Sequence, residues 1–476
     1  MRKAGRSAIE TRTIEHIPIN ERHGTSRQMF TIWFGTGLTL VTMTAGFTAT
    51  TLYGLAWWMA ALALLIGVLV GGIVLSLHAA QGPQTGIPQM LQTRAQFGSY
   101  GSLLVIVIVV FSFVGFFASN LVLGGQAIAA ISPINSTTGI LTIGVIATIA
   151  AAFGYKMIHR LAGLMSIFAG IALLLTVIWA LGVNAVPAGT WSGGVFTVIG
   201  FMGTVSLAAL WMISCAPFVS DYTRYMPKDT GVRSAFWATY AGSSLGAFLP
   251  MALGALLGSA LAGADVVSGL SAVTGGISVA VIIIFSVSLV TQSAVLVYCG
   301  ALSTIAVGQT LFSRWTPGAG ARIVVSVVIF GVSVMLALAG QAEFLTNFTN
   351  FMLILLCVLT PWTAINLIDY YVIRHGEYDL AAIFEQDGGR YGRFNRPAII
   401  AYLIGIAVQI PLLGTPMYTG PVAAAIGGID ISWVVGLIVT CPLYLILMRR
   451  SGPRKGAPAA SNAGSSEPAA FASEQS

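Results

Sequence analysis

Polar side chains at helical spacing interrupt two long apolar stretches of this sequence. Ser288, Thr291 and Gln292 are three and four residues apart, so they would share one face of a helix. Phe116 and Asn120 would share a helix face in the same way. Hydroxyl oxygens can ligate a hard cation, while an aromatic ring beside an amide suits a planar polar ligand. Alternatively, these hydroxyls bond back to carbonyls of their own helix, and the amide only links two helices without binding a ligand.

Two further apolar stretches contain residues that break helices. The first is Gly35–Thr39, where two glycines and two threonines would let a helix unwind and re-bond its backbone. The second runs from Trp211 to Pro217 and includes Ser214 and Cys215. Pro217 cannot donate a backbone hydrogen bond, which frees a carbonyl one turn earlier. Such carbonyls can face a ligand or simply mark a kink, and close helix packing would also explain the glycines.

Recognised catalytic and metal-binding patterns are missing from the sequence. We find no Ser-His-Asp, Cys-His, HExxH or Walker-type arrangement, and the four cysteines match no metal-site spacing. We therefore expect a protein that is not an enzyme and that needs no cofactor.

Membrane-spanning helices must position the polar residues. Of the 476 residues, 56% are hydrophobic and only 8% are charged, whereas a soluble domain carries roughly 25% charge. Apolar runs of spanning length predict an all-α polytopic membrane protein with 12 transmembrane helices. The expected spans are 29–50, 56–77, 102–131, 137–154, 161–182, 197–219, 235–261, 279–308, 323–341, 346–372, 397–413 and 431–448.

The basic residues give these spans an orientation. All 22 Lys and Arg residues fall in alternate gaps between the runs or in the two tails, and the other gaps hold only acids, namely Asp265, Glu343 and Asp430. Because basic residues mark the cytoplasmic side, we predict a multi-pass protein of the cell's inner (plasma) membrane with both termini cytoplasmic. The net charge of +7 is spread over many segments, which argues against a nucleic-acid partner and leaves the lipid bilayer as the surroundings.

The predicted spans are nearly free of charge in their middle portions. None of the 15 acidic residues lies near the centre of a span, and Asp221, Asp369 and His78 lie at cytoplasmic ends. A cationic substrate or a deep proton relay would require a buried ionisable group. The pattern therefore favours a neutral polar substrate, with any coupling cation held by backbone carbonyls and hydroxyls.

The two interrupted spans, 29–50 and 197–219, lie five spans apart, so their starting sides are opposite. Interrupted helices at matching positions of two inverted halves indicate a transporter's binding site. We expect five segments: a cytoplasmic N-terminal segment 1–28, a ten-helix inverted-repeat core 29–372, a cytoplasmic loop 373–396, two additional helices within 397–448, and a disordered cytoplasmic tail 449–476.

Four separated motifs resemble the nucleobase–cation symporter family, on its purine/cytosine permease branch. They are IEHIPINERHGTSRQMFTIWFG from Ile14, LHAAQGPQTGIPQMLQTRAQFGSYGS from Leu77, CAPFVSDYTRYMP from Cys215 and INLIDYYVIRHGEYDL from Ile365. The resemblance implies the leucine-transporter-type fold, a 5+5 inverted repeat plus two extra helices. It also implies uptake of a purine, cytosine or a related heterocycle together with sodium or protons.

Carried over residue by residue, the resemblance implies a substrate site between the first, third, sixth and eighth spans. The family's two stacking tryptophans fall on Phe116 and Cys215, with Trp211 one turn before the second. Cys215 departs from the family pattern, and so does Leu296, where the family has an asparagine. The candidate substrate-binding residues are Thr39, Phe116, Asn120, Trp211, Ser214, Cys215, Gln292 and Ser293.

The implied cation site lies between the first and eighth spans. Its carbonyls fall near Gly35 and Leu38, and its hydroxyl pair falls on Val290 and Thr291, so only one hydroxyl remains. With Ser288 added from the polar stripe, Gly35, Leu38, Ser288 and Thr291 are the candidate cation-binding residues, for Na+ as the possible metal or for H+ coupling.

We therefore expect a secondary active transporter, a cation symporter that imports a neutral nucleobase-like heterocycle such as cytosine, a purine or allantoin. The alternative within this fold is a permease for a vitamin precursor or an amino acid. A channel is less suitable because the spans are too apolar between the polar positions to form a continuous polar pore.

Overall fold

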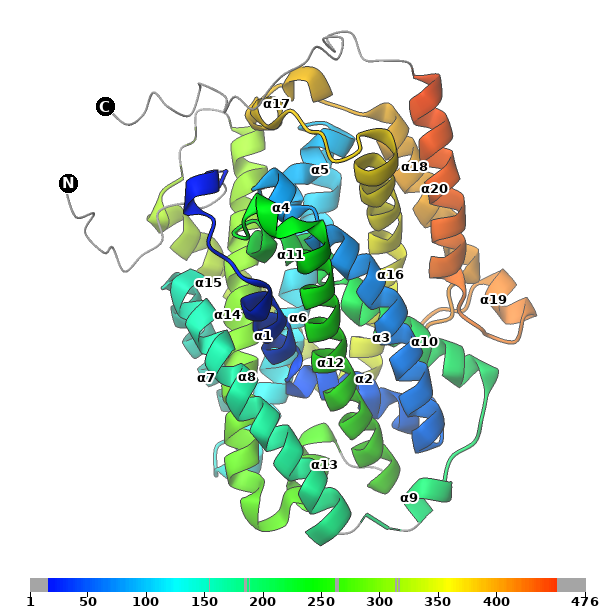
Figure 1. Ribbon diagram of the computed structural model, residues 1–476. Helices are drawn as coiled ribbons and strands as arrows, with labels where there is room; N and C mark the ends of the chain where they lie inside the picture. Colours follow the sequence, from blue (N-terminus) through cyan, green and yellow to red (C-terminus); the bar gives the residue numbers. More distant parts are fainter. Residues whose placement is uncertain are drawn as a thin grey trace, which may run out of the picture.

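Over the residues that the structure describes, the regular elements are all helices, and β-pairing is limited to an isolated bridge between Gly414 and Thr419 (Figure 1). This computed structural model describes residues 16–153, 155–183, 186–187, 189–261, 265–312, 315 and 317–451. Residues 1–15 of the expected N-terminal segment and 452–476 of the expected disordered tail lie outside the described residues.

The longer helices follow the expected spans closely. Their bounds are α1 Ser26–Gly37, α2 Leu40–Thr51, α3 Trp57–Ala79, α6 Ser102–Ile131, α7 Ser136–Ala152, α8 Tyr155–Ile178, α10 Val198–Ile213, α11 Ala216–Thr223, α12 Gly231–Ala260, α14 Ser278–Leu311, α15 Ala319–Gly340, α16 Phe344–Leu367, α18 Arg396–Ala407 and α20 Ser432–Arg450. Short helices lie between them: α4 Gly82–Thr85, α5 Gln89–Phe97, α9 Gly189–Ser192, α13 Val266–Thr274, α17 Leu380–Phe384 and α19 Pro421–Ala425.

The multi-span architecture is confirmed, while the number of crossings stays a prediction. In the described chain, eight helical segments are long and apolar enough to cross a membrane, or nine if the bent pair α1–α2 forms one span. One of these segments contains both α15 and α16, and two shorter apolar helices, Ser136–Ala152 and Arg396–Leu412, come in addition.

Both interrupted spans break where the sequence predicts, but only one of them bends sharply. Helix α1 ends at Gly37, Leu38 leaves the helical conformation, and α2 sets off at 57° to α1. Ser214 and Cys215 separate α10 from α11, yet Val198–Thr223 continues as a single apolar segment. The two halves are therefore alike in where they break and unlike in how far they bend.

Helix packing relates the two halves by approximate symmetry. Helix α12 packs on α1 and α2, and the matching pair is α3 on α10. In the same way, the contact of α7 with α14 corresponds to that of α15 with α6. The contact of α8 with α14 corresponds to that of α16 with α6. The segment before α1 contacts the end of α4, and α11 contacts α4 and α5, so the first broken span starts at the face where the second one ends. This is the arrangement expected of an inverted repeat.

Glycines allow the closest of these packings. A Cβ on Gly37 would lie 2.5 Å from the carbonyl of Gly246 in α12. In α3, a Cβ on Gly67 would lie 2.4 Å from the carbonyl of Val205, and a Cβ on Gly71 would lie 2.5 Å from the carbonyl of Ala209. Small residues let helix backbones approach in this way, so Gly67 and Gly71 serve helix packing.

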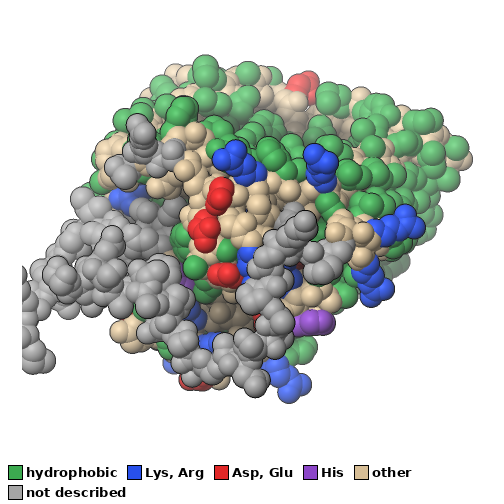
Figure 2. All heavy atoms as spheres, turned by 90° about the horizontal axis from the view of Figure 1, so that it is seen from above, with side chains coloured by type: hydrophobic (Ala, Val, Ile, Leu, Met, Phe, Trp, Pro, Cys, Tyr) green, Lys and Arg blue, Asp and Glu red, His purple; other side chains and the backbone are tan. Residues whose placement is uncertain are grey.

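One face of the molecule carries α4, α5, α17 and the C-terminal end of α20 (Figure 1). Figure 2 looks onto this face and shows Lys and Arg side chains distributed over it, with hydrophobic side chains along the flanks. We call it the basic face. The expected loop 373–396 lies here, and it contains α17 and a short 3-10 helix, Gly389–Tyr391.

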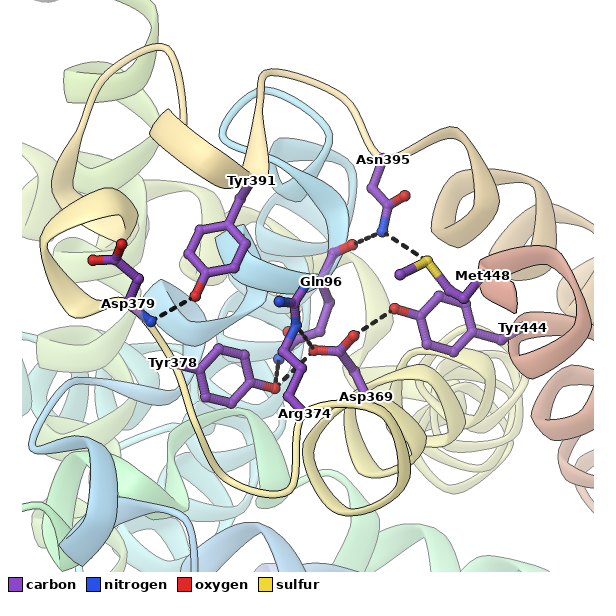
Figure 3. A network of polar contacts seen from close by, with 9 residues as sticks. All are labelled: Gln96, Asp369, Arg374, Tyr378, Asp379, Tyr391, Asn395, Tyr444 and Met448. Atoms are coloured by element: carbon purple, nitrogen blue, oxygen red, sulfur yellow. Dashed lines mark hydrogen bonds and ion pairs between the residues drawn. The ribbon is translucent and has the colours of Figure 1, made fainter. Parts of the chain in front are cut away.

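A buried ion pair ties the basic face together (Figure 3). Asp369 is fully buried at the end of α16 and accepts hydrogen bonds from Arg374 Nε at 2.9 Å and from the hydroxyls of Tyr378 and Tyr444 at 2.8 Å each. Burial would lower the pKa of Arg374, but the Asp369 carboxylate and the neighbouring tyrosines raise it on balance. The network joins α16, the segment after it and α20.

Candidate functional site

A cavity of about 50 Å³ lies beside the break between α1 and α2. Its walls come from α1, α3, α10, α11, α12 and α14. We call it the central cavity. It is lined by Ile32, Trp33, Thr36, Gly37, Leu75, Trp211, Met212, Cys215, Phe218, Tyr222, Ser243, Ala247, Gln292, Val295 and Leu296. Among the described residues that line it, none carries a formal charge.

Gln292 is the one carboxamide on the wall of this cavity. Its Nε2 donates to the carbonyl of Thr36 in α1 at 3.4 Å, and its Oε1 accepts from Asn120 Nδ2 in α6 at 3.3 Å. Both distances are longer than the usual 2.7–3.2 Å of strong N–H···O bonds, so these bonds are weak. Because an amide has two N–H donors and two lone pairs, Gln292 keeps capacity to bind a ligand edge.

Asn120 lies behind Gln292 and supports it from α6. Its Nδ2 also donates to Ser293 Oγ at 3.1 Å, while Ser293 donates in turn to the carbonyl of Leu289 at 2.8 Å. Asn120 Oδ1 is buried and accepts no hydrogen bond within the described structure. The structure thus brings the predicted residues Asn120, Gln292 and Ser293 into one polar cluster, of which only Gln292 lines the cavity.

Aromatic rings form two walls of the cavity region. Trp211 lines the cavity and meets Phe116 edge to face, with ring centroids 5.9 Å apart; Phe116 itself stands one layer behind it. On the side of the basic face, Trp33 stacks on Phe218 at 6.0 Å and meets Tyr222 edge to face at 5.8 Å. Flat apolar faces of this kind suit a planar ring.

The break between α10 and α11 uses its own side chains to satisfy a freed backbone group. Ser214 Oγ donates to the carbonyl of Trp211 at 2.8 Å, and the Cys215 thiol points to the same carbonyl at 3.6 Å. Cys215 reaches the central cavity, whereas Ser214 does not line it. Pro217 lies in the first turn of α11, where the missing N–H costs least.

Thr39 has a local role at the first break. It is fully buried, adopts an extended conformation and caps α2, accepting from the backbone N–H of Thr42 at 3.4 Å. Its hydroxyl also pairs with the Thr42 hydroxyl at 2.9 Å. Thr39 is therefore placed as an N-cap and does not line the central cavity.

Of the four candidate cation-binding residues, Ser288 and Leu38 are in direct contact at the same break. Ser288 Oγ donates to the carbonyl of Leu38 at 2.7 Å, which links α14 directly to the unwound turn. The carbonyl of Gly35 accepts from the Leu38 N–H at 3.2 Å, and Thr291 Oγ1 donates to the carbonyl of Val287 at 2.9 Å. Carbonyl and hydroxyl oxygens are the ligands that a hard cation such as Na+ would use.

Of the lining residues, only Trp211, Cys215 and Gln292 belong to the sequence-based site, and the others include two residue pairs, Trp33 with Thr36 and Phe218 with Tyr222. Trp33 and Thr36 are three residues apart in α1, and Phe218 and Tyr222 are four apart in α11. Each pair shares a helix face and adjoins a break that was identified from the sequence. Helical spacing applied outward from the breaks would have found them.

Known proteins share sequence with most of this chain. A model of the family described as "Permease for cytosine/purines, uracil, thiamine, allantoin" matches residues 16–436. The Bacillus subtilis (strain 168) protein YxlA, whose name places it with the purine-cytosine permeases, is 36% identical over 444 residues, covering 93% of this chain and 96% of that protein. The purine-cytosine permease fcyB of Emericella nidulans is 25% identical over 474 residues, covering 94% of this chain and 89% of that protein.

A solved structure shares the fold. Mhp1, a nucleobase-cation-symport-1 family transporter seen in a closed conformation with bromovinylhydantoin bound, superposes with a TM-score of 0.74 at 17% identity, covering 93% of this chain and 96% of that one. At this identity the likeness is evidence for the fold alone. It confirms the expected leucine-transporter-type class that the helix pairings also indicate.

Proposed function

The chain belongs to the family of permeases for cytosine/purines, uracil, thiamine and allantoin, and from this premise we propose that it imports a neutral nucleobase-like heterocycle. In this proposal it is a secondary transporter of the plasma membrane that couples uptake to Na+ or H+. No organic cofactor takes part, and the substrate crosses the membrane chemically unchanged.

The uncharged central cavity carries the proposal. Aromatic side chains line it, and Gln292 presents an amide whose donors and acceptors match those on a heterocycle edge. A substrate with a formal charge would be costly to bind here because no lining side chain would neutralise it. Trp211 and Trp33 offer ring faces for stacking.

The junction of α1 and α14 supports the cation coupling. Ser288 and Gln292, one helical turn apart on α14, bond to the carbonyls of Leu38 and Thr36 on α1. A cation bound by the Leu38 carbonyl and the hydroxyls of α14 would therefore stabilise the same helix contact that holds Gln292 at the cavity. This gives a physical route by which cation and substrate favour one conformation.

The orientation follows from the basic face. Lys and Arg side chains gather where α4, α5 and α17 lie (Figure 2), so we place this face in the cytoplasm, together with both termini. Alternating access would then rock the two repeats around the central cavity, opening it in turn to either side.

The test is uptake into proteoliposomes that contain the purified protein. Radiolabelled cytosine, adenine, hypoxanthine, uracil, allantoin and a hydantoin are compared with and without Na+ at two pH values. We expect saturable uptake of at least one compound that rises with an inward cation gradient and that returns the compound unchanged on extraction. Uptake of none of them, by protein shown to be folded, would contradict the proposal.

A vitamin precursor or an amino acid is the alternative substrate within this fold. The family description names thiamine, so thiamine and pyridoxine belong in the same panel as competitors. An amino acid is the weaker option because no acidic side chain among the described lining residues is available for its ammonium group. Accumulation of either vitamin in preference to every nucleobase would favour this alternative.

A further inference from the structure

A second cavity, of about 40 Å³, adjoins the central cavity on the side of the basic face. The two cavities share Tyr222 and Val295 as lining residues. The second one, which we call the vestibule, lies between α11, α14 and the segment that begins α5. Its position makes it the next space that a substrate would enter after leaving the central cavity toward the basic face.

The vestibule differs from the central cavity in having charged side chains in its wall, Asp221 and Arg224. Asp221 Oδ1 accepts the backbone N–H of Gln89 at 2.9 Å and so caps the start of α5. Within the described part of the chain, Asp221 Oδ2 accepts no hydrogen bond. The residue lines the cavity and is only partly buried, and the Arg224 guanidinium in the same wall acts on its carboxylate, so a ligand that binds Asp221 meets both charges.

Aromatic residues accompany the carboxylate. Tyr222 and Tyr298 both line the vestibule, the first from α11 and the second from α14. A carboxylate oxygen beside aromatic rings matches a planar heterocycle that has ring N–H groups or an exocyclic amine on one edge. A fully N-alkylated ring of the same size would have no donor for Asp221.

We propose that the vestibule is a second binding site on the transport path, in which a heterocycle donates N–H hydrogen bonds to Asp221 between the rings of Tyr222 and Tyr298. This inference rests on the proposed function, and it adds a selectivity step that the uncharged central cavity does not supply. Substrates with N–H donors are held twice on the way through, at Gln292 and then at Asp221.

Equilibrium binding to the full-length protein tests the inference. Radiolabelled cytosine, adenine and hypoxanthine are each titrated against the wild type and Asp221→Asn. Asparagine keeps an oxygen to cap α5 but replaces Oδ2 by an amide donor. We expect two bound molecules per wild-type chain for at least one probe, and one per chain for Asp221→Asn. A matched control is Asp265→Asn, because Asp265 caps α13 by the same kind of bond and lines neither cavity.

Native thiols locate the two bound molecules. Cys215 lines the central cavity and Cys299 lines the vestibule. With Cys357 and Cys441 replaced by alanine, a bound probe should slow labelling of both remaining thiols by N-ethylmaleimide. In Asp221→Asn, the protection of Cys215 should persist, while protection of Cys299 should require at least about tenfold more probe, the equivalent of one lost charge-assisted bond.

The outcomes separate this inference from the proposed function. A single site in the wild type that Asp221→Asn leaves unchanged overturns the vestibule site and leaves transport intact. Absence of both binding and uptake for every panel compound overturns both. If Asp221→Asn fails to fold, Tyr298→Leu takes its place, because it removes a ring without touching the α5 cap, and unchanged binding of two molecules in that variant also overturns the inference.

Discussion

Gln292→Met is the most direct test of the central cavity. Methionine has nearly the same length and volume as glutamine but offers no N–H donor and almost no acceptor. The substitution removes the bonds to the Thr36 carbonyl at 3.4 Å and from Asn120 at 3.3 Å. Asn120 keeps its bond to Ser293, so the cluster behind the cavity stays partly satisfied.

The effects on folding and on binding should differ in size. The two lost internal bonds are long, so each contributes about 0.5 kcal/mol, near the lower end of the range for neutral hydrogen bonds. A ligand edge would lose both a donor and an acceptor at normal distance, which amounts to about 2 kcal/mol. That corresponds to an increase of roughly 30-fold in Kd, whereas the free energy of unfolding should fall by only about 1 kcal/mol.

The assay measures binding and transport in parallel. Kd is obtained by equilibrium binding of the compound that is taken up best, and KM and the maximal rate by uptake into proteoliposomes. Gln309→Met is the matched control, because Gln309 lies on the same helix α14 and lines neither cavity. A Kd for Gln292→Met within about twofold of the wild type, in folded protein, would refute the assignment of this amide to the substrate.

Further substitutions test the other parts of the site and the fold. Ser288→Ala should raise the cation concentration for half-maximal uptake by roughly fivefold, because it removes a bond of about 1 kcal/mol that positions the cation-binding turn; dose–response curves measure this. Trp211→Ala should raise KM by about 5- to 30-fold through loss of a ring face, measured by uptake. Ser288→Ala combined with Gln292→Met should deviate from additivity by more than about 0.5 kcal/mol in a double-mutant cycle on substrate Kd. Asp369→Asn should lower the free energy of unfolding by about 2–3 kcal/mol, since it leaves the 16%-exposed Arg374 side chain without its counter-ion, and thermal unfolding in detergent measures this.

Each of the three single substitutions has a control on the same chain. Ser286→Ala alters a hydroxyl in α14 that bonds to no other described residue, and Trp58→Ala alters a largely exposed ring on the flank. Asp379→Asn weakens an exposed pair with Arg390 at 3.9 Å, which is worth little. If a control shifts its readout as far as the test variant does, the corresponding assignment is wrong.

The sequence predicts the fold well because membrane insertion leaves strong signals in it. Lys and Arg occur in every second gap between the apolar runs, and this pattern separates one predicted helix from the next. Gly37 and Pro217 mark the two helix breaks to within a few residues. The difference between the breaks was not predictable in this way. At the break before Pro217, α10 and α11 stay within one segment, and Ser214 compensates there by donating to the carbonyl of Trp211. Such compensation depends on side-chain rotamers and is invisible to a residue pattern.

The site was only partly predictable, because spacing along one helix does not say what the next helix presents. Phe116 and Asn120 do share a face, but Trp211 and Gln292 stand between them and the cavity. The ring at Trp33 belongs to the cavity although no pattern singled it out. Packing between distant helices decides which of several polar side chains reaches the cavity, and a single sequence carries little information about that packing.

The break in α1 connects the two halves of the proposed mechanism. Ser288 and Gln292 lie one turn apart on α14, and each bonds to a carbonyl that the unwound end of α1 presents. A cation that bridges the Leu38 carbonyl and the Ser288 hydroxyl would fix the end of α1, and with it the Thr36 carbonyl that holds Gln292. Coupling would then need no charged relay, only two neighbouring carbonyls on one stretch of backbone. That is why a core without acidic residues is compatible with cation-coupled transport, and why the effects of Ser288→Ala and Gln292→Met should not add.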